Sequence, residues 1–439
     1  MSNPTSWLKK GLGEDKRAWY IWLAAIIGCC FILKNLWSQF YPFIMDMYAL
    51  DAKTEVAFSN TCLGFGNLIV GPFVYGLLQD KFGPKPCFLL SAICMVGAII
   101  CSQVFLSIPD WESAKIWWWA TGAITGFGFA GYSTAGPSTA IKWNVDRIGK
   151  TTGIANAGTA LAPVWAAPVC AIVISSFGIA QAFLVLFGWG LFIVVILGLL
   201  LFRLPDEGWK PEGYVAPKEN MTGDSEGMTL SQIIKRPEFW LLWLCCCLTC
   251  IAGMFFSMNL SFVLMEGLVD VGGMDSTFVK TVIVATAMSF TAVANAVSRV
   301  VWGWIMDKLG SAWNALLVSY IGMLVLLLFF QFVYSSVVPC IAFMFILYLF
   351  YGGQSPLHQG CAPFVFGAKQ VGSLMSAMLF ATGVAMLIAP TLGAYIADVT
   401  GAYMNVFFVS AALMAVATVL MLVLRNLSKK RIAAEGSAE

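Results

Sequence analysis

Two basic residues stand deep inside long apolar runs of the sequence and could bind an anion there. Lys34 lies fifteen residues into the run that begins at Trp19, and Arg299 lies eight residues before Asp307. Helical rise places Lys34 about 22 Å along its run and Arg299 about 12 Å from its run's end. Cations inside a membrane are costly and normally face a cavity or a partner. Because no Asp or Glu lies at comparable depth, the sequence predicts that the missing anion is a bound substrate.

Each cation also has a structural interpretation. The long stem of Lys34 would let its ammonium group reach the outer surface of a membrane, and Arg299 could bond helix carbonyls instead of a substrate. A guanidinium keeps its proton, however, and its planar fork matches a carboxylate. Asn295 lies one helical turn before Arg299, so we expect its side chain to hold the guanidinium in place.

Aromatic residues gather near these cations in the sequence and are further candidates for substrate binding. Their rings could enclose a small anion and their hydroxyl groups could donate hydrogen bonds, although most aromatic residues of membrane proteins pack or anchor the interface. The candidates are Trp37, Tyr41, Tyr132, Tyr348 and Tyr351. His358, the one histidine, is expected to be packed and neutral rather than to relay protons.

The elements that position these residues follow from composition. The chain has 439 residues, of which 59% are hydrophobic and 11% charged, whereas soluble proteins are about 25% charged. Continuous apolar runs that each exceed the ~20 residues needed to cross a bilayer favour helices over a barrel. We predict an all-α membrane protein with twelve transmembrane helices in two six-helix pseudo-symmetric bundles. The predicted spans are 19–44, 55–78, 87–107, 116–139, 152–175, 181–203, 238–265, 277–305, 313–334, 337–360, 371–396 and 402–424.

One polar stretch divides the chain into halves. Residues 205–237 are rich in proline, glycine and acids, a composition typical of a cytoplasmic linker, between an N-terminal bundle at 1–204 and a C-terminal bundle at 238–439. Threading twelve spans puts twenty lysines and arginines on one side and three (Lys53, Lys115 and Lys280) on the other. The positive-inside rule then places both termini in the cytoplasm. We expect a multi-pass protein of the plasma membrane, specifically a bacterial inner membrane.

A short motif that occurs twice indicates an internal duplication. Residues 76–85 and 303–310 each follow the second span of a half, and Asp80 and Asp307 are 227 residues apart, about half the chain. An acid and a base beside glycines in a tight loop can lock the end of a helix, although they could serve only to fix topology. The expected gating residues are Gly76, Asp80, Lys81, Gly83, Arg147, Gly303, Asp307, Lys308 and Gly310.

The segment G-x-L-x-D-K-x-G-x-K at 76–85 resembles the marker of the major facilitator superfamily. Residues 235–243, 298–308 and 351–353 resemble the oxalate/formate antiporter family and the related monocarboxylate transporters. The resemblance implies that Arg299 binds a substrate carboxylate and that Asp80 latches a cytoplasmic gate. The oxalate carrier has a lysine in its eleventh span where this chain has Thr382, and Lys34 could substitute for it. Monocarboxylate transporters similarly place a lysine in the first span, about one turn further along.

These observations predict a secondary active transporter of small organic anions such as formate, oxalate, lactate or pyruvate. It would work by alternating access, as an anion exchanger or a proton-linked carrier. The alternatives are a carrier of a neutral solute or drug and a membrane sensor that does not transport. Twelve of the thirteen cysteines fall inside predicted spans and Cys361 directly follows one, and they show no paired metal-ligand spacing. No enzyme, cofactor, metal or nucleic-acid partner is expected; the partners are a small carboxylate and the lipid bilayer, and the protein is expected to be a monomer.

Overall fold

The computed structural model describes residues 16–30, 36–144, 148–205, 230–309, 311–366 and 371–435. Across those ranges the secondary structure is helical, without strands, and a helix occupies the position of every predicted span. Nine helical stretches in this part of the chain are long and apolar enough to cross a membrane, and Trp19–Cys29 is a shorter apolar helix. The predicted second span lies within the consecutive helices α5 (Lys53–Phe65), η2 (Gly66–Val70) and α6 (Gly71–Phe82), and the fourth lies within α8 (Trp111–Trp143).

Contacts between Cα atoms divide the chain into two compact units, each described here by itself. Unit 1 comprises residues 1–36 and 62–216, and unit 2 comprises residues 37–61 and 217–439. Besides η2, α6 and α8, the helices of unit 1 are α2 (Lys16–Cys30), α7 (Pro84–Ser107), α9 (Ile148–Phe177), α10 (Ile179–Ile193) and η3 (Val194–Leu201).

The helices of unit 2 begin with a short segment from the first half of the chain, η1 (Trp37–Phe40), α4 (Tyr41–Tyr48) and most of α5. The others are α11 (Leu230–Ile234), α12 (Pro237–Ser257), α13 (Leu260–Leu264), η4 (Met265–Val271), α14 (Ser276–Phe278), η5 (Val279–Ile283), α15 (Val284–Leu309), α16 (Ala312–Phe329), η6 (Phe330–Phe332), α17 (Val337–Tyr351), α18 (Gln354–Phe366), α19 (Val371–Thr400) and α20 (Tyr403–Glu435).

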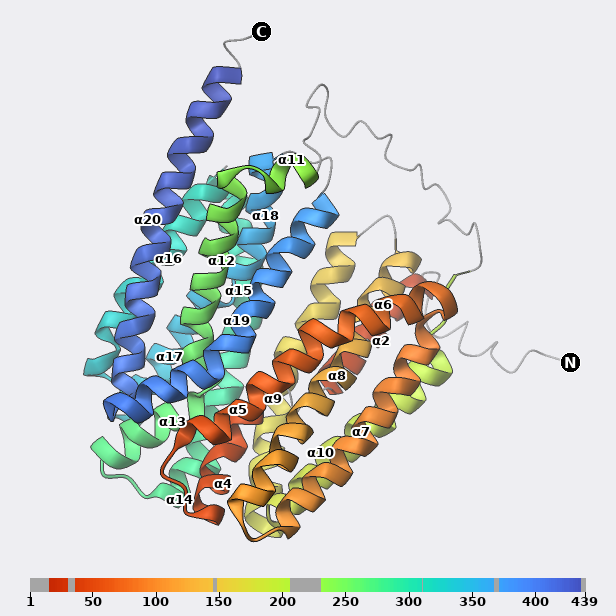
Figure 1. The fold of residues 1–439 in the computed structure, drawn as a ribbon, viewed down its shortest axis with the longest axis vertical. Helices are drawn as coiled ribbons and strands as arrows, with labels where there is room; N and C mark the ends of the chain where they lie inside the picture. Colours follow the sequence, from red (N-terminus) through yellow and green to blue (C-terminus); the bar gives the residue numbers. More distant parts are fainter. Residues whose placement is uncertain are drawn as a thin grey trace, which may run out of the picture. The chain divides into compact units, whose positions relative to one another are not determined.

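Glycines let the helices of unit 1 touch backbone to backbone. A Cβ atom at Gly126 of α8 would lie 1.9 Å from the carbonyl oxygen of Leu63, and one at Gly158 of α9 would lie 2.1 Å from that of Ala25 in α2. Real Cβ contacts are never this short, so a larger residue would force the helices apart. The Gly158 contact joins α9 to α2, and at Gly131 of α8 a Cβ atom would lie 2.9 Å from the Cys87 carbonyl oxygen of α7. Both helix pairs are in extensive contact (Figure 1).

In unit 2, α12 packs against both α19 and α20 (Figure 1), and two spans that were predicted as continuous are interrupted. The seventh breaks between α12 and α13, where the Asn259 amide donates to the carbonyls of Phe255 (3.0 Å) and Pro390 (3.2 Å). The tenth breaks at Gly352 and Gly353, between α17 and α18. Irregular backbone at membrane depth is tolerated when it is buried in protein and its polar groups have partners.

Candidate functional site

The helices α15 and α17 pack closely at the point that positions Arg299. The Ser298 hydroxyl donates a hydrogen bond to the Leu349 carbonyl at 2.6 Å, and the Trp302 indole donates to the same oxygen at 2.7 Å. Both donors lie on α15, on either side of Arg299 in the sequence, and Leu349 lies near the end of α17. Two bonds to one acceptor fix the rotation of α15 at this level.

The glycine pair after α17 makes this approach possible. A Cβ atom at Gly352 would lie 2.9 Å from the Asn295 carbonyl oxygen, and one at Gly353 would lie 2.3 Å from the indole ring of Trp302. A side chain at either position would therefore push α15 away. This explains physically why the sequence carries glycines here, next to the arginine segment that resembles carboxylate carriers.

Arg299 presents its guanidinium on an exposed part of α15. Its Nε atom donates to Asn295 Oδ1 at 3.2 Å, so the amide fixes one edge of the group. Among the residues that the structure describes, the ion pairs involve other side chains and no carboxylate lies within 4.0 Å of this one. The terminal nitrogens, which can form a bidentate pair with a carboxylate, are oriented by the protein without being neutralised by it.

Two tyrosines of α17 and a phenylalanine of α12 form an aromatic cluster near the end of α17. Tyr351 directly precedes Gly352, whose backbone lies against Asn295, one turn before Arg299 on α15. Its ring lies perpendicular to that of Tyr348 with ring centroids 6.0 Å apart. Phe256 of α12 packs edge-on against both rings. Gly253 of α12 makes room for Tyr351, because a Cβ atom there would lie 2.0 Å from the ring.

Thr382 of α19 reaches the same region through a cysteine that the sequence did not single out. Its hydroxyl is 3.6 Å from the Cys250 thiol of α12 and donates to the Met378 carbonyl at 3.3 Å. Gly253, which lies against the Tyr351 ring, is one helical turn after Cys250 on α12. The structure thus brings together Arg299, Asn295, Tyr348, Tyr351 and Thr382 within unit 2, and adds Cys250. Cys250 could have been found in the sequence from its i, i+4 spacing with Cys246, which places both thiols on one face of α12.

The other predicted binding residues lie elsewhere. Lys34 is outside the described residues. The Trp37 indole donates to Ser59 Oγ at 2.7 Å, and Tyr41 is buried against Phe262, with ring centroids 5.0 Å apart. Tyr132 belongs to the core of unit 1, where its hydroxyl donates to the Ala24 carbonyl at 2.8 Å. Its phenolic hydrogen is therefore already engaged in a helix contact.

The repeated loop motif is described in part. Gly83 immediately precedes α7 with φ of +79°, a conformation that side chains disfavour, so the motif needs glycine there. Around Gly76 and Gly303 the space that a Cβ atom would occupy is open, with no described neighbour within 4 Å. Lys81 is exposed, as is Lys308, whose Nζ lies 4.0 Å from the Trp304 ring centroid. The side chains of Asp80 and Asp307, and the residues Arg147 and Gly310, fall outside the description.

His358 is fully buried in α18. One of its ring nitrogens, Nε2, is hydrogen-bonded to the Tyr320 hydroxyl, and the other, Nδ1, to the Gln354 carbonyl at 2.7 Å. Both nitrogens are thus engaged inside the protein, which agrees with a packed histidine.

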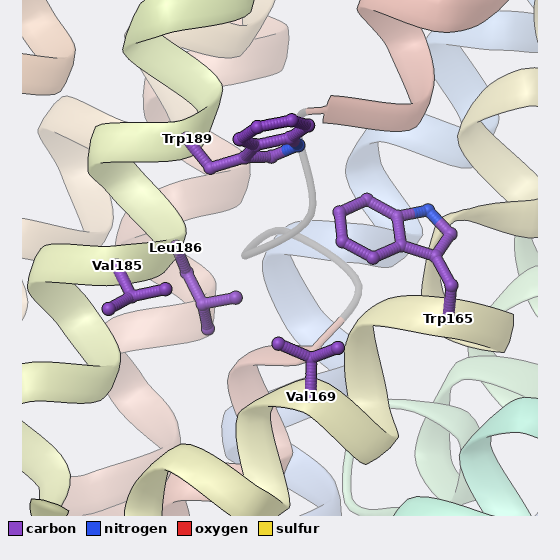
Figure 2. A pocket seen from close by; sticks show the side chains of 5 residues that line it. All are labelled: Trp165, Val169, Val185, Leu186 and Trp189. Carbon is purple, nitrogen blue, oxygen red and sulfur yellow. The ribbon is translucent and has the colours of Figure 1, made fainter.

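A pocket of about 260 Å³ lies between α9 and α10 in unit 1. Figure 2 shows Trp165 and Val169 on one side, and Val185, Leu186 and Trp189 on the other. The described residues that line it carry no charge, and such a lining suits a hydrocarbon chain better than a carboxylate. It is separate from the residues gathered around Arg299, which belong to unit 2.

Two carboxylates that sequence reasoning did not single out cap helices at one end of unit 2. Asp398 accepts hydrogen bonds from the first residues of α5, and Glu266 accepts them from the first residues of α20. A visible signal was the position of each acid at the end of a predicted span, on the side that has few lysines and arginines.

Among the described residues, nine apolar helical stretches of bilayer length define a multi-pass membrane protein. The family model described as Major Facilitator Superfamily matches residues 23–290 and 273–439. The chain therefore belongs to the major facilitator superfamily.

Individual relatives agree with this assignment. The chain is 24% identical to the oxalate:formate antiporter of Oxalobacter formigenes over 408 residues, which is 90% of each protein. It is 22% identical to the uncharacterized MFS-type transporter YhjX of Escherichia coli (strain K12), over 68% of this chain and 70% of that one. In fold it is similar to a crystal structure of the nucleoside transporter NupG, with a TM-score of 0.70, 12% identity, and 93% and 100% of the two chains covered.

Proposed function

We propose that the protein carries small organic anions, specifically mono- or dicarboxylates, across the membrane. The observation that supports this most directly is Arg299, whose guanidinium is exposed and held by Asn295 without a carboxylate partner among the described residues. A small carboxylate would complete the ion pair, with the Tyr351 hydroxyl as a hydrogen-bond donor beside it and the Thr382 side chain nearby. The similarity to an oxalate:formate antiporter supports the same substrate class.

The charge suggests how binding and transport are linked. An unpaired cation at membrane depth is costly, so the empty carrier resists the rearrangement that would enclose it. A bound anion neutralises the charge and removes that penalty. This logic favours exchange of one anion for another over net uniport. The predicted opposition of Lys34 to Arg299 would add a second positive contact from the first half of the chain.

The proposal is tested by uptake into proteoliposomes. Labelled formate, lactate, pyruvate, oxalate and succinate are compared with and without anion inside the vesicles. Loss of one member of a desolvated charge pair costs about 2–5 kcal/mol, so we expect Arg299→Ala to lower uptake by roughly 30-fold or more. Arg299→Lys keeps the charge but not the planar fork and should give an intermediate rate.

Arg425→Ala is the matched control, because this arginine lies near the end of α20, in the last turns of the chain's final helix. It should leave uptake unchanged. Transport of any of the five anions that persists at the wild-type rate in Arg299→Ala would contradict the assigned role. Competition by uncharged solutes but not by carboxylates would instead favour a carrier of neutral compounds.

A further inference from the structure

The segment Trp37–Thr61, named here the docked hairpin, belongs by sequence to the first half of the chain but packs within unit 2. Its first limb, η1 and α4, contacts α13. There the Ser261 hydroxyl is hydrogen-bonded to the Ser38 carbonyl, and Tyr41 lies against Phe262. Its second limb, in α5, reaches α19, where the Thr61 hydroxyl is 2.7 Å from that of Thr391 and 3.0 Å from the Leu387 carbonyl.

The tip of the second limb is held by a carboxylate from the other half. Asp398, near the end of α19, accepts the backbone N–H groups of Lys53 at 3.0 Å and Thr54 at 2.8 Å, and also the Thr54 hydroxyl. These are the first residues of α5, whose N–H groups have no partner inside the helix. Helix N-termini also favour negative charge. Asp398 therefore acts as an N-cap that is supplied 345 residues away in the sequence.

A second carboxylate repeats this arrangement beside the first. Glu266 of η4 accepts the N–H groups of Tyr403 at 2.6 Å and Met404 at 3.3 Å, which begin α20. Lys53 of the docked hairpin joins the two caps: its Nζ is 3.9 Å from Glu266 Oε2 and 5.1 Å from the centroid of the Tyr403 ring. At the first limb, Asp46 forms an ion pair with Lys280.

The docked hairpin and the rest of unit 2 thus carry complementary charges at three contacts: Asp398 with the N-terminus of α5, Glu266 with Lys53, and Lys280 with Asp46. The first of these contacts requires one particular alignment of α5. A bond to a helix N-terminus is lost as soon as the helix moves away along its axis, whereas apolar side chains can slide over one another. The N–H groups released from Asp398 would then bind water, because they lie at the end of a span rather than within it. The contact between Asp398 and α5 is therefore formed in one position of the hairpin and fully broken in another.

We propose that the docked hairpin is the outer gate of the carrier, closed when the N-terminus of α5 is capped by Asp398 and open when that cap is released. This inference rests on the proposed transport function and on the orientation predicted from lysine and arginine placement. It assigns Asp398, Glu266 and Lys280 to closing the substrate path, not to binding substrate.

Hydrogen–deuterium exchange of the purified protein tests the gate without any substrate. Asp398→Ala removes the cap, so we expect peptides covering residues 53–61 to exchange at least tenfold faster than in the wild type. Asp110→Ala is the matched control. Asp110 caps α8 locally, accepting the Ser113 N–H at 3.0 Å, so its loss should raise exchange only around residues 111–115. Unchanged exchange of residues 53–61 in Asp398→Ala would overturn the proposal.

A reversible cross-link tests whether the gate must open during transport. The double variant Thr54→Cys with Asp398→Cys places two thiols where hydroxyl and carboxylate now meet. Its oxidation should lower carboxylate uptake at least tenfold, and a reductant should restore uptake, whereas the single variants should not respond. Mass spectrometry of the linked peptides confirms the bond.

The results separate the two proposals. Absence of a cross-link, or full uptake by the cross-linked protein, would overturn the gate and leave the anion carrier standing. Faster exchange of residues 53–61 in Asp398→Ala, in a protein that moves none of the five anions, would support the gate and contradict the proposed substrate class. If Asp398→Ala does not fold, the cross-linked pair decides alone.

Discussion

At the scale of single residues, the feature that matters most is the pairing of Arg299 with Asn295, which lie one turn apart on α15 and have different roles. Arg299 supplies charge, and Asn295 supplies orientation by accepting from Nε at 3.2 Å. A guanidinium that is held at one edge presents its terminal nitrogens in one plane, which is what bidentate pairing with a carboxylate requires. Asn295 is thus a positioning residue that acts through Arg299.

We therefore expect Asn295→Ala to weaken substrate binding more than it slows turnover. A hydrogen bond to a charged group contributes about 1.5–3 kcal/mol, so KM for the preferred anion should rise roughly tenfold or more. Asn295→Gln, which keeps the amide, should recover part of the loss. Initial rates of uptake over a range of anion concentrations measure the split. An unaltered KM in Asn295→Ala would show that the contact does not orient the arginine.

At the scale of elements, the seam between α15 and α17 is built from glycine. Gly353 lies against the Trp302 indole, while Gly303, on the same α15 helix as that tryptophan, has open space around it among the described residues. The two positions provide a matched pair of substitutions that differ in their surroundings.

We predict that Gly353→Ala destabilises the protein and that Gly303→Ala does not. The added methyl group at 353 must displace an aromatic ring, and overpacking of this kind costs about 1–3 kcal/mol. In Gly303→Ala the gain in helix propensity, about 0.5–1 kcal/mol, has no opposing contact. Thermal unfolding in detergent should show a lower midpoint for the first variant and an equal or higher one for the second. Equal midpoints for both would contradict the packing argument.

At the scale of the whole molecule, we expect closure of the docked hairpin to be sensitive to pH. Glu266 lies between candidate membrane spans, and burial raises its pKa above the ordinary value despite the opposing effects of Lys53 and the two backbone N–H groups. Asp270 also faces it and adds to the rise, and Tyr334 lies within electrostatic range. If release of the hairpin hydrates Glu266, the closed form binds a proton more tightly than the open form.

The sign of the effect follows. Burial of the Glu266 charge outweighs its attraction to Lys53 in setting this pKa. Closure should therefore be strongest in acid, below the ordinary pKa of a glutamate, and should weaken as pH rises through the raised pKa of Glu266. We expect protection factors of residues 53–61, corrected for the intrinsic pH dependence of exchange, to fall as pH rises through that range. Glu266→Gln should flatten that profile. A profile that rises with pH, or one that is unaltered in Glu266→Gln, would contradict the linkage.

The sequence was enough to predict the helices and the family, because long apolar runs and a duplicated loop motif are local signals. It also predicted the contact of Asn295 with Arg299, since the two residues are one helical turn apart; their role in binding substrate stays a prediction. The interruptions at Asn259 and at Gly352 were not predicted, because residues of these types also occur in continuous helices. The caps formed by Asp398 and Glu266 join residues more than 130 positions apart, and no local pattern carries such a pairing.

The bond between the Trp37 indole and Ser59 fastens the two limbs of the docked hairpin to each other. If the hairpin opens as proposed, we expect limbs that are tied in this way to move together rather than to separate. Bending would then be displaced to the hairpin's base, where η2 forms a wider helical turn directly after α5. Such π-type turns often occur at functional sites, so we expect this turn to be the point about which the hairpin moves.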